Sequence, residues 1–76
     1  MTKVELAALA ALAKLKDEYK GDLEYYTDIA YDYSKEHNTE KYSELINKAN
    51  KRERQIDKIK SLIKDLTEEL VKELES

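Results

Sequence analysis

Few side chains in this sequence could carry out nucleophilic or metal-assisted chemistry. There is no cysteine and only one histidine, His37, which excludes thiol catalysis and a multi-histidine metal centre. His37 is therefore the one histidine that could act as a base for a serine, and the sequence marks no residue that would orient its imidazole. No Glu-x-x-His spacing of a di-iron bundle occurs. We therefore expect no enzymatic activity and no cofactor. The serines in question are Ser34, Ser43, Ser61 and Ser76.

The tyrosines are better suited to recognition than to catalysis. All six lie between Tyr19 and Tyr42. Tyr25 and Tyr31 fall outside the apolar pattern and stand among acids such as Asp28, a composition common at protein-binding surfaces. They could form a partner face or simply belong to a solvated surface. The other four, Tyr19, Tyr26, Tyr33 and Tyr42, follow the apolar pattern and are predicted to lie in the core.

Residues 48–64 hold the one basic run of the sequence. Such a run could bind phosphates, and Lys51, Arg54 and Lys58 would then be the contacting residues. However, the bases scatter around a helix, and the net charge is -3. A solvated, salt-bridged face is the competing interpretation, and nucleic-acid binding is the alternative function.

The elements that must position these side chains are helices. The chain has no proline and a single glycine, Gly21, and good helix formers dominate. The best turn signal is residues 37–39, where Asn38 can adopt a left-handed backbone and Thr39 can cap the next helix. The sequence predicts one all-α domain with a helix over about residues 2–36, a turn at 37–39 and a helix over about 40–75.

Apolar residues recur at alternating spacings of three and four in both halves, which predicts a coiled-coil seam, the line of residues on each helix that faces the other. One polar residue interrupts each seam, Asp22 in the first half and Arg52 in the second. If the chain folds back at residues 37–38, positions whose numbers sum to about 75 lie opposite each other, and Asp22 meets Arg52. We expect this ion pair to fix the register of an antiparallel hairpin. The seams are Ala8, Leu12, Leu15, Tyr19, Asp22, Tyr26, Ile29 and Tyr33, and Tyr42, Leu45, Ala49, Arg52, Ile56, Ile59, Ile63, Leu66 and Leu70.

A three-helix bundle is the alternative fold. Gly21 could end a first helix and Asp22 could cap a second, which would give helices near residues 2–20, 22–36 and 39–75. The last helix would then extend far beyond the other two.

Self-association is expected, because a chain this short rarely stabilises a single core without disulfides, metal or a partner. The open end of the hairpin carries more apolar side chains than one seam can cover. A homodimer forming a four-helix bundle would cover them. The predicted association residues are Leu6, Leu9, Ala10, Ala13, Leu62, Val71 and Leu74.

No membrane attachment is expected. The longest apolar stretch, residues 6–13, is too short to cross a bilayer, and no targeting segment is recognisable. We expect a soluble protein, either cytoplasmic or recombinant.

The expected architecture resembles that of the Rop family, small plasmid-encoded hairpins that dimerise into four-helix bundles and bind paired RNA loops. The resemblance covers the whole chain as architecture, without a residue-by-residue match to an RNA-contacting motif. Residues 61–74 are also similar to computationally designed bundles in their idealised pattern. The tyrosine-rich middle, His37, Asn47 and Asn50 depart from that ideal. Together these resemblances imply a structural or interaction module, a self-associating scaffold of the kind designed to bind a protein.

Overall fold

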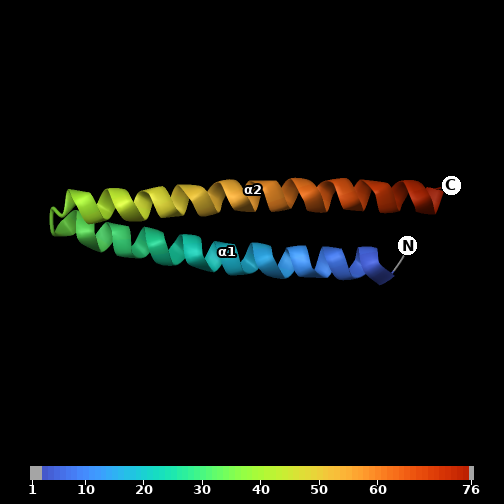
Figure 1. Cartoon of the computed structure of the whole chain (residues 1–76), viewed down its shortest axis with the longest axis horizontal. Coiled ribbons are helices and arrows are strands. Elements are labelled where there is room, and N and C mark those ends of the chain that lie inside the picture. Colours follow the sequence, from blue (N-terminus) through green and yellow to red (C-terminus); the bar gives the residue numbers. More distant parts are fainter. Residues whose placement is uncertain (1–2, 76) are drawn as a thin grey trace.

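The computed structural model describes residues 3–75 and consists of two antiparallel helices. Helix α1 spans Lys3–Lys35 and helix α2 spans Thr39–Glu75. They lie side by side as one hairpin of 59 × 15 × 12 Å, with the turn at one end and both termini at the other (Figure 1). The predicted all-α hairpin is confirmed. The predicted beginning of the first helix at residue 2 lies outside the described residues.

Helix α1 continues through Gly21 without a break, so the three-helix alternative is wrong. Gly21 has no positive φ, and a Cβ added to it would meet nothing within 4 Å. Good helix formers on both sides hold this position in the helix although glycine costs about 1 kcal/mol relative to alanine. The glycine therefore lies on an open surface of the helix.

The end of α1 differs from the prediction, because His37 rather than Asn38 adopts the left-handed backbone, with φ 60°. The N–H of His37 donates to the carbonyl of Ser34 at 3.1 Å, and the N–H of Asn38 donates to the carbonyl of Tyr33 at 3.0 Å. These two bonds form the Schellman motif, which satisfies carbonyls that a helix end leaves unpaired. The left-handed residue of this motif, His37, directly precedes Asn38, and α2 begins one residue later at Thr39.

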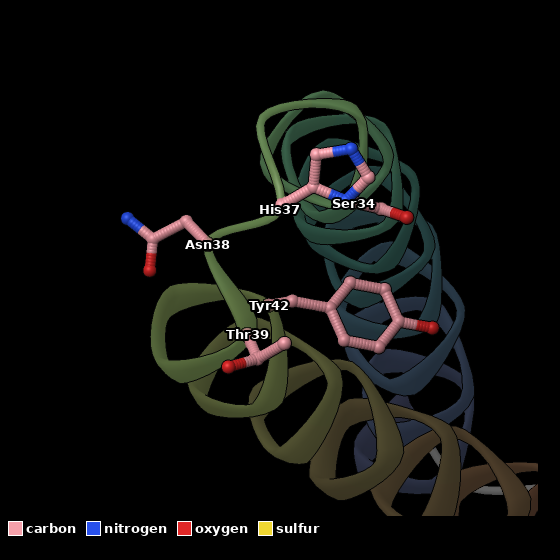
Figure 2. A pocket seen from close by; sticks show the side chains of 5 residues that line it. All are labelled: Ser34, His37, Asn38, Thr39 and Tyr42. Carbon is pink, nitrogen blue, oxygen red and sulfur yellow. The ribbon is translucent and has the colours of Figure 1, made fainter.

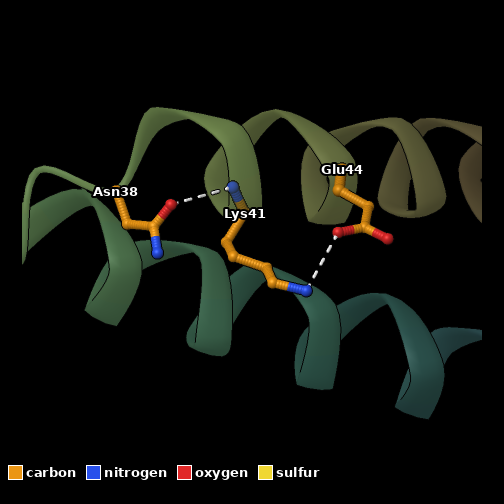
Figure 3. A network of polar contacts seen from close by, with 3 residues as sticks. All are labelled: Asn38, Lys41 and Glu44. Carbon is orange, nitrogen blue, oxygen red and sulfur yellow. Dashed lines mark hydrogen bonds and ion pairs between the residues drawn. The ribbon is translucent and has the colours of Figure 1, made fainter.

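Helix α2 is capped by Asn38 rather than by Thr39, which is already its first helical residue. The Asn38 carbonyl accepts a hydrogen bond from the Tyr42 N–H at 3.0 Å, and its side-chain Oδ1 accepts one from the Lys41 N–H at 3.2 Å (Figure 3). Lys41 Nζ also lies 3.5 Å from Glu44 Oε2 in an exposed ion pair. Asparagine is among the strongest N-caps, and here one residue both closes α1 and opens α2.

The core is a single line of contact between the helices. Most seam residues are half-buried because a two-helix hairpin covers each helix from one side only. Over the described residues, neither helix is long and apolar enough to cross a membrane. Among the same residues, the buried ones are Ala30, Ala49, Ile56, Ile59 and Leu70.

Candidate functional site

A polar cluster interrupts the seam halfway along the hairpin. Arg52 Nε lies 3.2 Å from Asp22 Oδ2, so the structure brings the two predicted seam residues together. The Arg52 guanidinium also lies 4.5 Å from the centre of the Tyr19 ring, and its Nη1 donates to Gln55 Oε1 at 2.7 Å. Asp22 is one turn after Tyr19 on α1, and Gln55 is one turn after Arg52 on α2.

The cluster has the character of a structural ion pair. The side chains of Arg52 and Asp22 are 27% and 45% exposed, so neither charge is fully removed from water. Three neighbours already engage the Arg52 guanidinium, which leaves it little capacity for a further ligand. The arrangement fixes the register of the two helices, because a shift of one turn would separate the charges.

One side of the hairpin, which we call the apolar flank, carries apolar side chains near the turn and again at the open end. A shallow hollow of about 190 Å³ there is lined by both helices, with Ala30 from α1 and Ile46 from α2. Steps of seven residues keep to one side of a coiled-coil helix. Leu23 and Leu9 therefore lie on the same side of α1 as Ala30, and Leu74 lies on the same side of α2 as Ile46. The apolar residues of this flank are Leu6, Leu9, Ala13, Leu23, Ala30, Tyr31, Tyr42, Ile46, Val71 and Leu74. Polar residues on the same side are Lys16, Glu53, Lys60 and Thr67 along the middle, and Thr27 and Ser34 at the hollow.

The opposite side, which we call the basic flank, carries two adjoining hollows over the turn half of the hairpin. The smaller, of about 190 Å³, is lined by Tyr26, Lys48, Lys51 and Arg52. The larger, of about 290 Å³, shares Tyr26 and Lys48 with the smaller one. The remaining lining residues of the larger hollow are Tyr25, Ile29, Tyr33, Lys41, Glu44 and Leu45.

The predicted association residues do not share one surface. Leu62 and Val71 are 51% and 46% exposed, but they are about two and a half turns apart along α2, so they point to opposite flanks. Leu62 follows Lys48 by two steps of seven and belongs to the basic flank. Leu6 and Val71 lie on the apolar flank, and the exposed Ala10 lies at its outer edge. The sequence predicts them as one surface because together they exceed what one seam can cover, a criterion that does not separate the two sides of each helix.

The two predicted partner-face tyrosines are exposed but are not brought together. Tyr25 is 62% exposed and lines the larger hollow of the basic flank, where its ring packs edge-on against Tyr26 at 5.9 Å. Tyr31 is 61% exposed, lies on the other side of α1 and has Lys35 Nζ 4.5 Å from its ring centre. Tyr42 was expected in the core and is 39% exposed, because α1 ends at Lys35 and little of it covers this first turn of α2.

A further hollow of about 330 Å³ lies at the turn and contains the one pairing of serine and histidine that catalysis could use. It is lined by Ser34, His37, Asn38, Thr39 and Tyr42. Figure 2 shows the Tyr42 ring extending from α2 towards α1, while the Asn38 side chain points away from the hairpin. Within residues 3–75, no hydrogen bond joins the Ser34 hydroxyl to the His37 imidazole, and the hollow contains no carboxylate. The geometry required for an activated serine is absent there.

Of the predicted phosphate-binding residues, Lys51 lines the smaller hollow of the basic flank, whereas Arg54 and Lys58 are exposed on α2 and line none of the four hollows described. Two lysines line the larger hollow together with tyrosines: Lys48 belongs to the predicted basic run, whereas Lys41 lies outside that run and was not predicted. Their spacing of seven could have placed both on one side of the helix. Among the described residues, no group of three or more acids or histidines is placed to hold a metal ion.

Comparison with protein-family models, with curated proteins and with solved structures found no match for this chain.

Proposed function

We propose that this hairpin is a non-enzymatic interaction module that self-associates through its apolar flank, with two copies forming a four-helix bundle. The observation that supports the proposal is the line of apolar side chains on this flank; the basic flank also exposes Val4 and Leu62, by 78% and 51%, but carries charged residues between them and the turn. Leu6, Val71 and Leu74 on the apolar flank are 51%, 46% and 76% exposed, and they continue a line of half-buried side chains. Covering one exposed leucine or valine contributes on the order of 1 kcal/mol.

The dimensions of the flank suit a second copy of the chain. A face 59 Å long and 15 Å wide has an area on the order of 900 Å². Each partner of an ordinary stable interface buries about 800 Å². A second hairpin would present the same apolar flank, as a twofold dimer requires. It would also cover Ile46 and Leu23, which the single hairpin leaves half-buried.

Two variants of α2 with matched exposure test the proposal. Val71→Glu places a charge on the apolar flank, and Leu62→Glu places the same charge at a similarly exposed position on the basic flank. Light scattering on a sizing column over a range of concentrations would give the dimer dissociation constant. We expect Val71→Glu to raise it at least about tenfold and Leu62→Glu to leave it nearly unchanged.

The possible results test self-association and the location of the interface separately. A folded monomer of the unmodified chain at every concentration would overturn self-association. A dimer weakened equally by both variants would show that the interface is not confined to the apolar flank. Circular dichroism on both variants would establish that the helices still form.

A further inference from the structure

The smaller hollow of the basic flank is surrounded by positive charge. Its lining consists of three cationic side chains, Lys48, Lys51 and Arg52, and one aromatic residue, Tyr26. Arg52 is paired with Asp22. Within residues 3–75, neither Lys48 nor Lys51 has a carboxylate at ion-pair distance. The hollow therefore retains two uncompensated ammonium groups about one helical turn apart, a spacing at which both can reach one anion.

The larger hollow continues the smaller one as an aromatic and apolar surface. Tyr26 and Lys48 belong to both, and Lys48 Nζ lies 5.9 Å from the centre of the Tyr26 ring. Tyr25, Tyr33 and Leu45 add further aromatic and aliphatic surface. Because Tyr25 is 62% exposed, its ring offers a face on which a planar group can stack. The one carboxylate in this lining, Glu44, is engaged by Lys41 at 3.5 Å.

From this juxtaposition we propose that the basic flank binds a small ligand made of an aromatic ring joined to a phosphomonoester. The phosphate occupies the smaller hollow, where Lys48 and Lys51 donate to its oxygens. The ring lies in the larger hollow against Tyr25 and Tyr26. Nucleoside monophosphates and phosphotyrosine share this chemistry. The site is separate from the apolar flank, so a dimer formed through that flank leaves it open.

The surrounding charges favour a short anion over a nucleic-acid strand. The α2 wall from Lys41 to Arg52 is about 16 Å long at a helical rise of about 1.5 Å per residue. Steps of seven from Tyr25 along α1 lead to Glu18 in one direction and Asp32 in the other, and both are exposed. A polyanion extending past either end of the hollows would meet one of these acids. A single phosphate in the smaller hollow would not.

The experiment is a titration of the full chain followed by ¹H–¹⁵N correlation spectra. The probes are adenosine 5′-monophosphate, phosphotyrosine, adenosine and inorganic phosphate. We expect the two aromatic phosphates to bind at least about tenfold more tightly than adenosine or phosphate alone, with the largest shifts at the amides of residues 25–26 and 48–51. Whichever aromatic phosphate binds more tightly identifies the source of the ligand.

Three variants locate the site. Lys48→Gln combined with Lys51→Gln should weaken binding by at least about tenfold. The matched control, Lys58→Gln combined with Lys72→Gln, removes the same charge farther along the same side of α2 and should change binding less than about twofold. Tyr25→Leu should reduce the affinity for adenosine 5′-monophosphate to that for inorganic phosphate.

Three results would overturn the inference. One is equal weakening by the two lysine pairs, which would indicate general charge attraction. Another is aromatic phosphates that bind no better than phosphate alone. The third is an octathymidylate strand that binds far more tightly than either aromatic phosphate, which would make the flank a nucleic-acid surface. Light scattering on each variant reports self-association separately, so failure of this site is distinguishable from failure of the dimer.

Discussion

At the scale of single residues, Arg52 links the two helices through contacts with three side chains. It holds Asp22, Tyr19 and Gln55 in one cluster across the two helices. We expect Arg52→Leu alone to lower the free energy of unfolding by about 1–2 kcal/mol, because Asp22 and Gln55 lose their partner in the seam. The cost stays below that of a fully buried pair, because water reaches the half-exposed Asp22. Urea unfolding followed by circular dichroism would measure it.

The control for this variant is Arg54→Leu, which removes an exposed base from the same helix and should change stability by less than about 0.5 kcal/mol. Replacing Asp22 and Arg52 together by leucine should be neutral or stabilising, because two apolar side chains then meet in the seam. A higher melting temperature for Arg52→Leu alone would contradict the pairing.

His37 offers a second test at this scale. Its φ of 60° costs a side chain about 1 kcal/mol, and glycine adopts this backbone without that cost. We therefore expect His37→Gly to stabilise the hairpin by up to about 1 kcal/mol, measured by thermal unfolding. The same substitution at Lys14, an exposed position in the interior of α1, should destabilise by about 1 kcal/mol. A loss of stability for His37→Gly would mean that the imidazole makes a contact worth more than the strain.

At the scale of elements, Gly21 is the weakest point of α1. It lies in the helix with open space where a Cβ would be. Gly21→Ala should therefore raise the free energy of unfolding by about 1 kcal/mol through helix propensity alone. Thermal unfolding checks this, and Ala11→Gly, at an exposed position of the same helix, should give a change of similar size and opposite sign. Destabilisation by Gly21→Ala would show that the position is packed against something that the single hairpin lacks.

The helices and their register could be predicted from the sequence because each depends on a periodic signal. The spacing of three and four marked both seams, and its two polar breaks, Asp22 and Arg52, fixed how they align. The turn was less predictable, since both His37 and Asn38 tolerate several backbone conformations, and the hydrogen bonds of the Schellman motif decide between them. Exposure at the open end was anticipated, but its division into two flanks was not. That division requires following each helix around its circumference, which separates Leu62 from Val71.

At the scale of the whole molecule, the two flanks give the hairpin two different surfaces. Association through the apolar flank would add a second layer of buried side chains, so that the single line of contact between two helices becomes the core of a four-helix bundle. The basic flank would remain in solvent on both copies. Assembly and ligand binding would then use opposite sides of the same helices, so a variant on one flank should leave the other function intact.

Self-association also predicts how stability depends on concentration. For a dimer that unfolds to two chains, each tenfold increase in protein concentration stabilises the folded state by about 1.4 kcal/mol, because mass action favours assembly. For an assembly of this size the melting temperature should rise by about 3–6 °C per tenfold increase. Circular dichroism between micromolar and millimolar concentrations measures it, with Val71→Glu as the variant expected to lose most of the dependence and Leu62→Glu as the one expected to keep it. A melting temperature that is identical across this range would mean that the buried line of Ile56, Ile59 and Leu70 is enough to hold a single hairpin together, and the apolar flank would then have no partner to explain it.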